Sequence, residues 1–197
     1  MEVPMYSDFN YKKLRPLDVF CTSASSLTGR LIRLGTACLK NRSGIIEATR
    51  QQVANHCAIV ISLGDKLWVA EMVDDGLKIN SCRKYLNNKK EKIVAVKRHK
   101  KLSQNILSVI VNDDLVRMCQ GMRDYDWKLI AQYFGLGRND KSKYYCSELC
   151  EVLANKYDTT WDRYQLKRRP AWQMISPIEI QFGAPEYSDF VHDIYVE

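Results

Sequence analysis

The chain has 197 residues, of which 46% are hydrophobic and 27% are charged, an ordinary composition for a globular protein. Its 30 lysines and arginines exceed its 23 aspartates and glutamates, so the net charge of +7 is moderate, and no specific nucleic-acid partner is expected. No run approaches the roughly eighteen apolar residues of a membrane-spanning helix, and the N-terminus lacks the apolar segment of a secretory signal. We expect one domain over residues 1–197.

The cysteines favour a reducing compartment. They are odd in number and scattered, so they form no disulfide framework. They also lack the C-x-x-C pairs of a structural zinc site, and neither a metal ion nor an organic cofactor is expected. The sequence therefore predicts a cytoplasmic protein, or one in the host cell cytoplasm if it is viral. The seven are Cys21, Cys38, Cys57, Cys82, Cys119, Cys146 and Cys150.

The first half of the chain is predicted to be rich in strands. Residues 15–20 form a short first strand, and the serines within residues 23–26 offer N-caps for a helix that continues toward Leu39. Turn signals at Gly64-Asp65 and at Asp74-Asp75-Gly76 then separate apolar runs as hairpins. Together these runs predict an antiparallel meander. The strands that follow the helix are expected at residues 55–63, 66–73, 77–80 and 93–97.

The second half is predicted to be helical. Helical spacing of apolar residues is present over residues 105–121 and 125–134, and a further helix is expected from Cys146 to about residue 155. Ser176-Pro177 is a typical start for one last helical turn. A strand-rich half followed by a helix-rich half predicts an α+β fold.

The run Tyr144-Tyr145-Cys146-Ser147-Glu148-Leu149 places a cysteine on the opening turn of a helix. The dipole and the unpaired N–H groups at a helix N-terminus favour a thiolate. The N–H of Cys146 is a candidate oxyanion donor, and Tyr145 is a second candidate. The alternative is a buried structural cysteine, because free cysteine is among the most buried residue types.

The run Asn55-His56-Cys57-Ala58-Ile59-Val60 places a histidine at the start of an apolar strand. Such a histidine can accept a thiol proton and return it to a leaving group. Glu71 interrupts an apolar face of the partner strand, and a diagonal offset keeps it within reach of His56, where it would orient the imidazole as the third member of a triad. The alternatives are a histidine bonded to backbone and a glutamate that faces solvent.

In their order, these segments resemble the circularly permuted branch of the NlpC superfamily, which comprises YiiX-like bacterial and poxvirus proteins with a papain-like fold. The resemblance covers residues 17 to about 180 and rests on the order and spacing of short motifs. In that branch the histidine and a polar residue precede the helix that carries the cysteine. The matching motifs are Leu17-Asp18-Val19-Phe20, Asn55-His56-Cys57-Ala58-Ile59-Val60, Val69-Ala70-Glu71-Met72, Gly76, Tyr125-Asp126, Tyr145-Cys146-Ser147-Glu148-Leu149 and Ser176-Pro177.

The resemblance implies a small antiparallel sheet packed against helices, with Cys146 as nucleophile, His56 as general base and Glu71 as orienting residue. The chain departs from the family pattern at three positions without losing a catalytic candidate. The family commonly has Gly-Asp, a serine before the histidine and a small residue after the glutamate. Here those positions hold Leu17-Asp18, Asn55 and Met72.

The expected function is that of a cysteine-dependent hydrolase, a peptidase, amidase or thioesterase that acts through a Cys-His-Glu triad and a thioacyl-enzyme. A lipid-directed acyltransferase or lipase-like enzyme is an alternative, because permuted relatives resembling lecithin retinol acyltransferase share this order. A non-catalytic binding module is another. The expected partner is a peptide, amide or acyl-lipid substrate. The basic residues at 89–101 are either solvated strand ends or face an anionic membrane surface, and the oligomeric state is left open.

Overall fold

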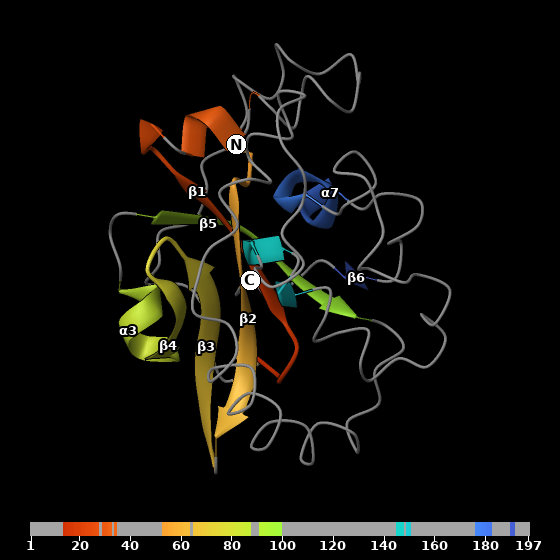
Figure 1. The fold of residues 1–197 in the computed structure, drawn as a ribbon. Coiled ribbons are helices and arrows are strands. Elements are labelled where there is room, and N and C mark those ends of the chain that lie inside the picture. Colours follow the sequence, from red (N-terminus) through yellow and green to blue (C-terminus); the bar gives the residue numbers. More distant parts are fainter. Residues whose placement is uncertain are drawn as a thin grey trace, which may run out of the picture.

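The computed structural model describes residues 14–27, 29–32, 34, 53–63, 65–87, 91–99, 145–147, 149–150, 176–182 and 190–191. The helices predicted over residues 105–121 and 125–134 lie outside these residues, and so does the Tyr125-Asp126 pair. The described part is an antiparallel sheet accompanied by few helices (Figure 1).

Five strands of six to nine residues and one two-residue strand build the sheet. They are β1 (Val19–Ala24), β2 (His56–Leu63), β3 (Lys66–Val73), β4 (Gly76–Ser81), β5 (Glu91–His99) and β6 (Phe190–Val191). Their order is β4-β3-β2-β1-β5-β6, and every neighbouring pair is antiparallel.

The first four strands form the predicted meander, but β5 does not continue it. Instead, β5 pairs with β1 on the side away from β2. β1 thereby becomes a central strand whose backbone is hydrogen-bonded on both sides, as a strand whose first four residues are buried requires. The buried residues Ile93, Ala95 and Val96 make β5 a suitable partner.

The predicted bounds of β2, β3, β4 and β5 lie within two residues of the observed ones, whereas the first strand was placed wrongly. The chain turns at residues 16–17, and β1 begins only at Val19. The physical reason is the side chain of Asp18, whose Oδ2 accepts a hydrogen bond from the backbone N–H of Arg15 at 2.8 Å. This local bond favours a turn over an extended strand.

The same turn is anchored to both neighbours of β1. Asp18 binds the guanidinium of Arg98 on β5 through both carboxylate oxygens, each at 2.8 Å. The N–H of Leu17 donates to the carbonyl of Val60 on β2 at 2.7 Å. Leu17 itself has φ 69°, the left-handed region that glycine adopts most readily. The turn is therefore held in a strained conformation by bonds to two strands.

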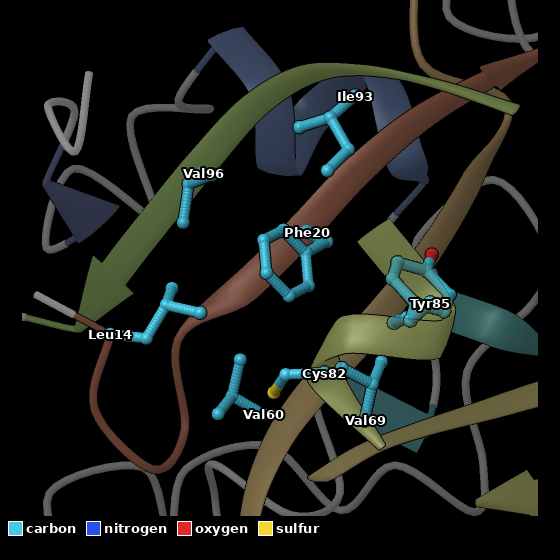
Figure 2. Packing of buried hydrophobic residues seen from close by; sticks show 9 residues of the cluster. Leu14, Phe20, Val60, Val69, Cys82, Tyr85, Ile93 and Val96 are labelled. Carbon is cyan, nitrogen blue, oxygen red and sulfur yellow. The ribbon is translucent and has the colours of Figure 1, made fainter. Parts of the chain in front are cut away.

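One face of the sheet packs against α3 (Cys82–Leu86), a short helix that the sequence did not predict. Ser81 caps it by accepting a hydrogen bond from the N–H of Lys84. On this face the rings of Phe20 and Tyr85 stack with their centroids 5.5 Å apart (Figure 2). Complete burial of a side chain such as Phe20 contributes roughly 1.5–3 kcal/mol. The buried cluster comprises Leu14, Phe20, Ala58, Val60, Val69, Cys82, Tyr85, Ile93 and Val96.

Alternation along the strands sends Cys21, Cys57 and Ile59 to the opposite face. Two helical segments far apart in the sequence accompany the sheet. α7 (Pro177–Phe182) lies against β5 and β1, and it begins at Pro177 as expected. The other segment is the start of the predicted cysteine helix, described at residues 146–147 and 149–150. None of the helices in the described ranges combines the length and apolar character that crossing a bilayer requires.

Candidate functional site

His56 and Glu71 form a hydrogen bond in which Nε2 of the imidazole and Oε2 of the carboxylate are 3.0 Å apart. The pairing of β2 and β3 produces this contact. Ala58 lies opposite Glu71, so His56, two residues earlier, is a diagonal neighbour on the same face. The side chains are 12% and 9% exposed, respectively. The pair is thus largely withdrawn from solvent, where its electrostatic interaction is stronger than at the surface.

Asn80 on β4 completes the hydrogen bonding of Glu71. Its Nδ2 donates to Oε1 of the carboxylate at 3.2 Å, so both carboxylate oxygens are engaged. Val69 lies opposite Asn80, which makes Asn80 the diagonal neighbour of Glu71 on the other side. Sequence reasoning missed Asn80, although counting outward from the turn before Gly76 would have placed it on this face.

The arrangement orients the imidazole. If Nε2 carries the proton that it donates to Glu71, the neutral ring has its lone pair on Nδ1. The carboxylate would also stabilise the imidazolium that forms when Nδ1 accepts a proton. A carboxylate held by two neighbours in this way cannot rotate without losing a hydrogen bond. The row of His56, Glu71 and Asn80 therefore has the chemistry of a positioned acid–base pair.

The residue before His56 is fastened to β1 by three hydrogen bonds. The N–H of Asn55 donates to the carbonyl of Thr22 at 2.9 Å. Its side-chain Oδ1 accepts from the N–H of Ala24 at 2.9 Å, and its Nδ2 donates to the carbonyl of Ala24 at 2.7 Å. Asn55 is buried. These bonds fix the backbone from which the His56 side chain projects.

Gly29, on the helical segment after β1, packs against Asn55 and Ala24. A Cβ at position 29 would lie 2.4 Å from Nδ2 of Asn55 and 2.8 Å from the carbonyl oxygen of Ala24. Both distances are shorter than any ordinary carbon contact, so only glycine fits. The N–H of Gly29 is in turn accepted by Oγ of Ser26 at 3.1 Å, and this residue is one of the predicted caps.

A residue of α7 also holds the segment before His56. Oε1 of the buried Gln181 accepts a hydrogen bond from the N–H of Ala54 at 2.7 Å, across 127 positions of sequence. The segment that leads into His56 is therefore held by β1 and by α7. The sequence did not indicate the hydrogen bonds of Asn55 or of Gln181, because a side chain that binds a distant backbone group leaves no local pattern.

Cys146 begins a helical turn, as the sequence predicted. The N–H of Leu149 donates to the carbonyl of Tyr145 at 3.0 Å, so Tyr145 occupies the N-cap position and Cys146 the first helical position. The backbone N–H groups of a first turn have no partner within their own helix. Both side chains are buried, with Cys146 only 1% exposed.

Cys146 lies near three other cysteines, as their mutual electrostatic interactions show. Burial raises the pKa of Cys57 well above its usual value, and the nearby thiols of Cys21, Cys150 and Cys146 raise it further. The pKa of Cys150 is raised by burial first and then by Cys146 and Cys21. Cys21 and Cys57 are directly opposite each other on β1 and β2, and all four cysteines are free thiols. The helix of Cys146 thus lies beside the strand residue that follows His56.

The three predicted triad members are therefore placed differently. His56 and Glu71 are in direct contact, whereas Cys146 is near Cys57, which alternates to the face opposite His56. Within the described ranges, no three His, Cys, Asp or Glu side chains are grouped so that they could hold a metal ion. Comparison of the sequence with protein-family models and with curated proteins gives no match.

Proposed function

We propose that the protein is a cysteine-dependent hydrolase of the permuted papain-like type, with Cys146 as nucleophile, His56 as general base and Glu71 as orienting residue. The observation that carries the proposal is the buried row of His56, Glu71 and Asn80. Both oxygens of the carboxylate beside His56 are hydrogen-bonded, so this carboxylate can hold the imidazole in the single orientation that a general base requires.

The turn before β1 supports the resemblance to the permuted NlpC branch. That branch commonly has glycine where this chain has Leu17, and Leu17 has a backbone conformation suited to glycine. A leucine that adopts a glycine-like φ indicates that the backbone path at this position matters more than the residue type. The following Asp18, which the resemblance also includes, holds that path through Arg15 and Arg98.

In the proposed reaction, Nδ1 of His56 accepts the thiol proton of Cys146. The thiolate then attacks the carbonyl carbon of an amide, ester or thioester. The N–H of Cys146 donates one hydrogen bond to the oxyanion, and Tyr145 is proposed as a second donor. His56 protonates the leaving group, which departs with the bonding electron pair. Water then hydrolyses the thioacyl-enzyme, and the proton that it releases restores the resting state.

The proposal makes two geometric demands. Because His56 and Cys57 alternate across the sheet, the sulfur of Cys146 must approach the imidazole around the beginning of β2, where His56 is the first residue. Because Cys146 is buried, the substrate must also displace whatever covers its sulfur. Both requirements concern the sulfur of Cys146. The rate at which this thiol reacts is therefore the quantity to measure.

Alkylation with iodoacetamide, followed by peptide mapping, tests the pairing of Cys146 with His56. We expect Cys146 to react first and to keep its reactivity below pH 7, because an imidazolium stabilises the thiolate. Cys82 is an internal control, since burial raises its pKa to about 11 and keeps it protonated. His56→Ala should slow the labelling of Cys146 by at least about tenfold.

Arg83→Ala serves as the matched control, because Arg83 is exposed on α3 and the substitution should leave the labelling of Cys146 unchanged. If Cys146 reacts no faster than Cys82, or if His56→Ala leaves its rate unchanged, the hydrolase proposal is wrong. The protein would then be better described as a binding module that uses the same fold.

A further inference from the structure

Three large apolar side chains stand out as exposed in the part of the chain that the structure describes, and all three lie on one helical segment. Leu27 is 74% exposed, Leu31 is 41% exposed and Leu34 is 46% exposed. The segment follows β1 directly and is seen in Figure 1 as the orange ribbon at the end of that strand. Scattered exposed leucines are ordinary, but a group of three on one element is not.

The three leucines share one side of the helix. At 3.6 residues per turn, positions 27, 31 and 34 fall within about 60° of one another around the helix axis. Gly29 and Ile32 lie on the opposite side, and both are buried. The helix therefore turns one side to the protein, where Gly29 contacts Asn55, and a leucine stripe away from it.

The charged residues that adjoin the stripe in the sequence are all basic. Arg30 lies beside the leucines on the helix and is exposed. No aspartate or glutamate occurs between Asp18 and Glu47, and the charged residues of that stretch are all basic, namely Arg30, Arg33, Lys40 and Arg42. Exposed leucines that are flanked in the sequence by basic residues are typical of helices that lie in the interface of an anionic lipid bilayer.

We propose that the leucine stripe, defined as Leu27, Leu31 and Leu34, docks the protein onto an anionic membrane surface. The leucine side chains enter the boundary between the headgroups and the acyl chains, and Arg30 binds the headgroup phosphates. The basic residues at 89–101 that the sequence suggested begin near the same end of β1, because Ser23 and Ala24 pair with Lys92 and Glu91 on β5. Resting on the proposed hydrolase function, the docking also indicates an acyl-lipid as the substrate class.

A lipid surface fits the stripe better than a second copy of the chain does. A stable interface between proteins covers about 800 Å² on each partner, and three leucines, two of them more than half covered, provide only a fraction of that area. A local excess of positive charge would also repel an identical surface. Binding to an anionic bilayer requires only a few apolar side chains that insert to a shallow depth and basic residues beside them. The exposed leucines and Arg30 meet these two requirements.

The position of the stripe relative to the candidate site supports an acyl-lipid substrate. Gly29 is on the inner side of the same helix and packs on Asn55, whose next neighbour in the chain is His56. Docking through the stripe therefore holds the segment that carries His56 close to the lipid surface. An enzyme positioned in this way would meet acyl carbonyl groups at the headgroup boundary.

Co-sedimentation of the full chain with vesicles tests the docking. Vesicles of phosphatidylcholine alone are compared with vesicles that also contain phosphatidylserine, at low and at high salt. We expect binding only to the anionic vesicles and weaker binding at high salt. Leu31→Glu should reduce binding by at least about tenfold, because it replaces an inserted leucine with a charge. Arg30→Ala should reduce it by about fivefold.

Arg83→Ala is the matched control, because it changes the net charge by the same amount as Leu31→Glu but lies on α3. It should bind as the unchanged protein does, and circular dichroism should show that Leu31→Glu is folded, since Leu31 is on the surface. Equal losses in Arg83→Ala and Leu31→Glu would mean that only overall charge matters and would overturn the proposal. Absence of binding to either kind of vesicle would overturn it as well.

Two further results separate this proposal from its rivals. If the protein self-associates without vesicles and Leu31→Glu abolishes that association, the stripe is an interface between copies and the membrane proposal is wrong. The docking is measured without catalysis, so it can be confirmed even if the labelling of Cys146 contradicts the hydrolase. If docking is confirmed but acyl-lipids are not hydrolysed while peptides or simple amides are, only the substrate class is wrong.

Discussion

Both carboxylate oxygens of Glu71 are hydrogen-bonded, one to His56 and the other to Asn80. A substitution that removes the charge of Glu71 but keeps its shape distinguishes its role in orienting the imidazole from its role in stabilising the imidazolium. Glu71→Gln can retain a hydrogen bond to the ring but cannot stabilise an imidazolium. We expect it to slow the alkylation of Cys146 near neutral pH by roughly tenfold to a hundredfold.

Asp74→Asn, on the exposed turn between β3 and β4, is the control for the loss of one negative charge and should have no effect. Asn80→Ala should lower the rate by less than Glu71→Gln does, because it removes an orienting hydrogen bond and leaves the carboxylate. Equal rates for Glu71→Gln and the unchanged protein would show that Glu71 serves the fold alone.

Gly29 reverses the usual effect of replacing a helical glycine. In a helix, Gly→Ala ordinarily stabilises by about 1 kcal/mol. Here the added Cβ would collide with Asn55 and with the carbonyl of Ala24, so Gly29→Ala should lower the free energy of unfolding by about 1–3 kcal/mol. Urea denaturation measures this difference, and a stabilised variant would contradict the observed packing.

Asn55→Ala tests the other side of the same contact. It leaves the N–H and the carbonyl of Ala24 without their side-chain partners, at a cost of about 2–4 kcal/mol. In the double variant with Gly29→Ala, the contact with Nδ2 no longer exists. The combined loss should therefore be smaller than the sum of the single losses, and strict additivity would show that the two residues act independently.

At the scale of elements, the turn before β1 sets the path of the strand that becomes central in the sheet. Leu17 is buried, so Leu17→Ala should cost about 2–5 kcal/mol of stability. Leu17→Gly removes the same side chain but also the strain of φ 69°. We expect the glycine variant to be more stable than the alanine variant by about 1 kcal/mol in thermal or urea unfolding.

That order is the reverse of the usual one, because glycine in an extended or helical segment is less stable than alanine. An alanine variant more stable than the glycine variant would show that the backbone at position 17 leaves the left-handed region once leucine is absent. The comparison therefore tests the geometry of the turn directly and does not depend on any assumption about activity.

The whole molecule is expected to lose stability at alkaline pH because of its buried thiols. Burial raises the pKa of Cys82 to about 11 and the pKa values of Cys57 and Cys150 well above their usual range. In the unfolded chain these thiols ionise near pH 8.5. Their contribution to stability is complete below that pH and is lost as the pH rises through the folded values.

Unfolding measured from pH 8 to pH 11 should therefore show a steady decrease in stability, with a shallower slope in Cys82→Ala. Val69→Ala is the control, because it weakens the same apolar cluster without removing a titrating group. Its slope should equal that of the unchanged protein even though its stability is lower throughout. Parallel slopes for all three proteins would contradict the raised pKa of Cys82.

Local patterns were sufficient for much of the sheet. Period-two apolar runs and the turn signals around Asp65 and Gly76 predicted β2, β3 and β4, because a hairpin brings together residues that are close in sequence. The same count placed His56 and Glu71 on one face within reach of each other. Ser176-Pro177 likewise predicted the start of α7, because proline fits a first helical position.

Contacts between distant segments were decided only by the tertiary structure. Three contacts join residues that are far apart in the sequence and share no pattern there. They are the pairing of β5 with β1, the hydrogen bond from the N–H of Ala54 to Gln181, and the contact of Gly29 with Asn55. Periodicity and turn signals determined where β2, β3, β4 and β5 lie. The pairing of β5 with β1, and the thiols that surround Cys146, depend on packing in three dimensions, because these contacts join segments that are far apart in the sequence and share no local pattern.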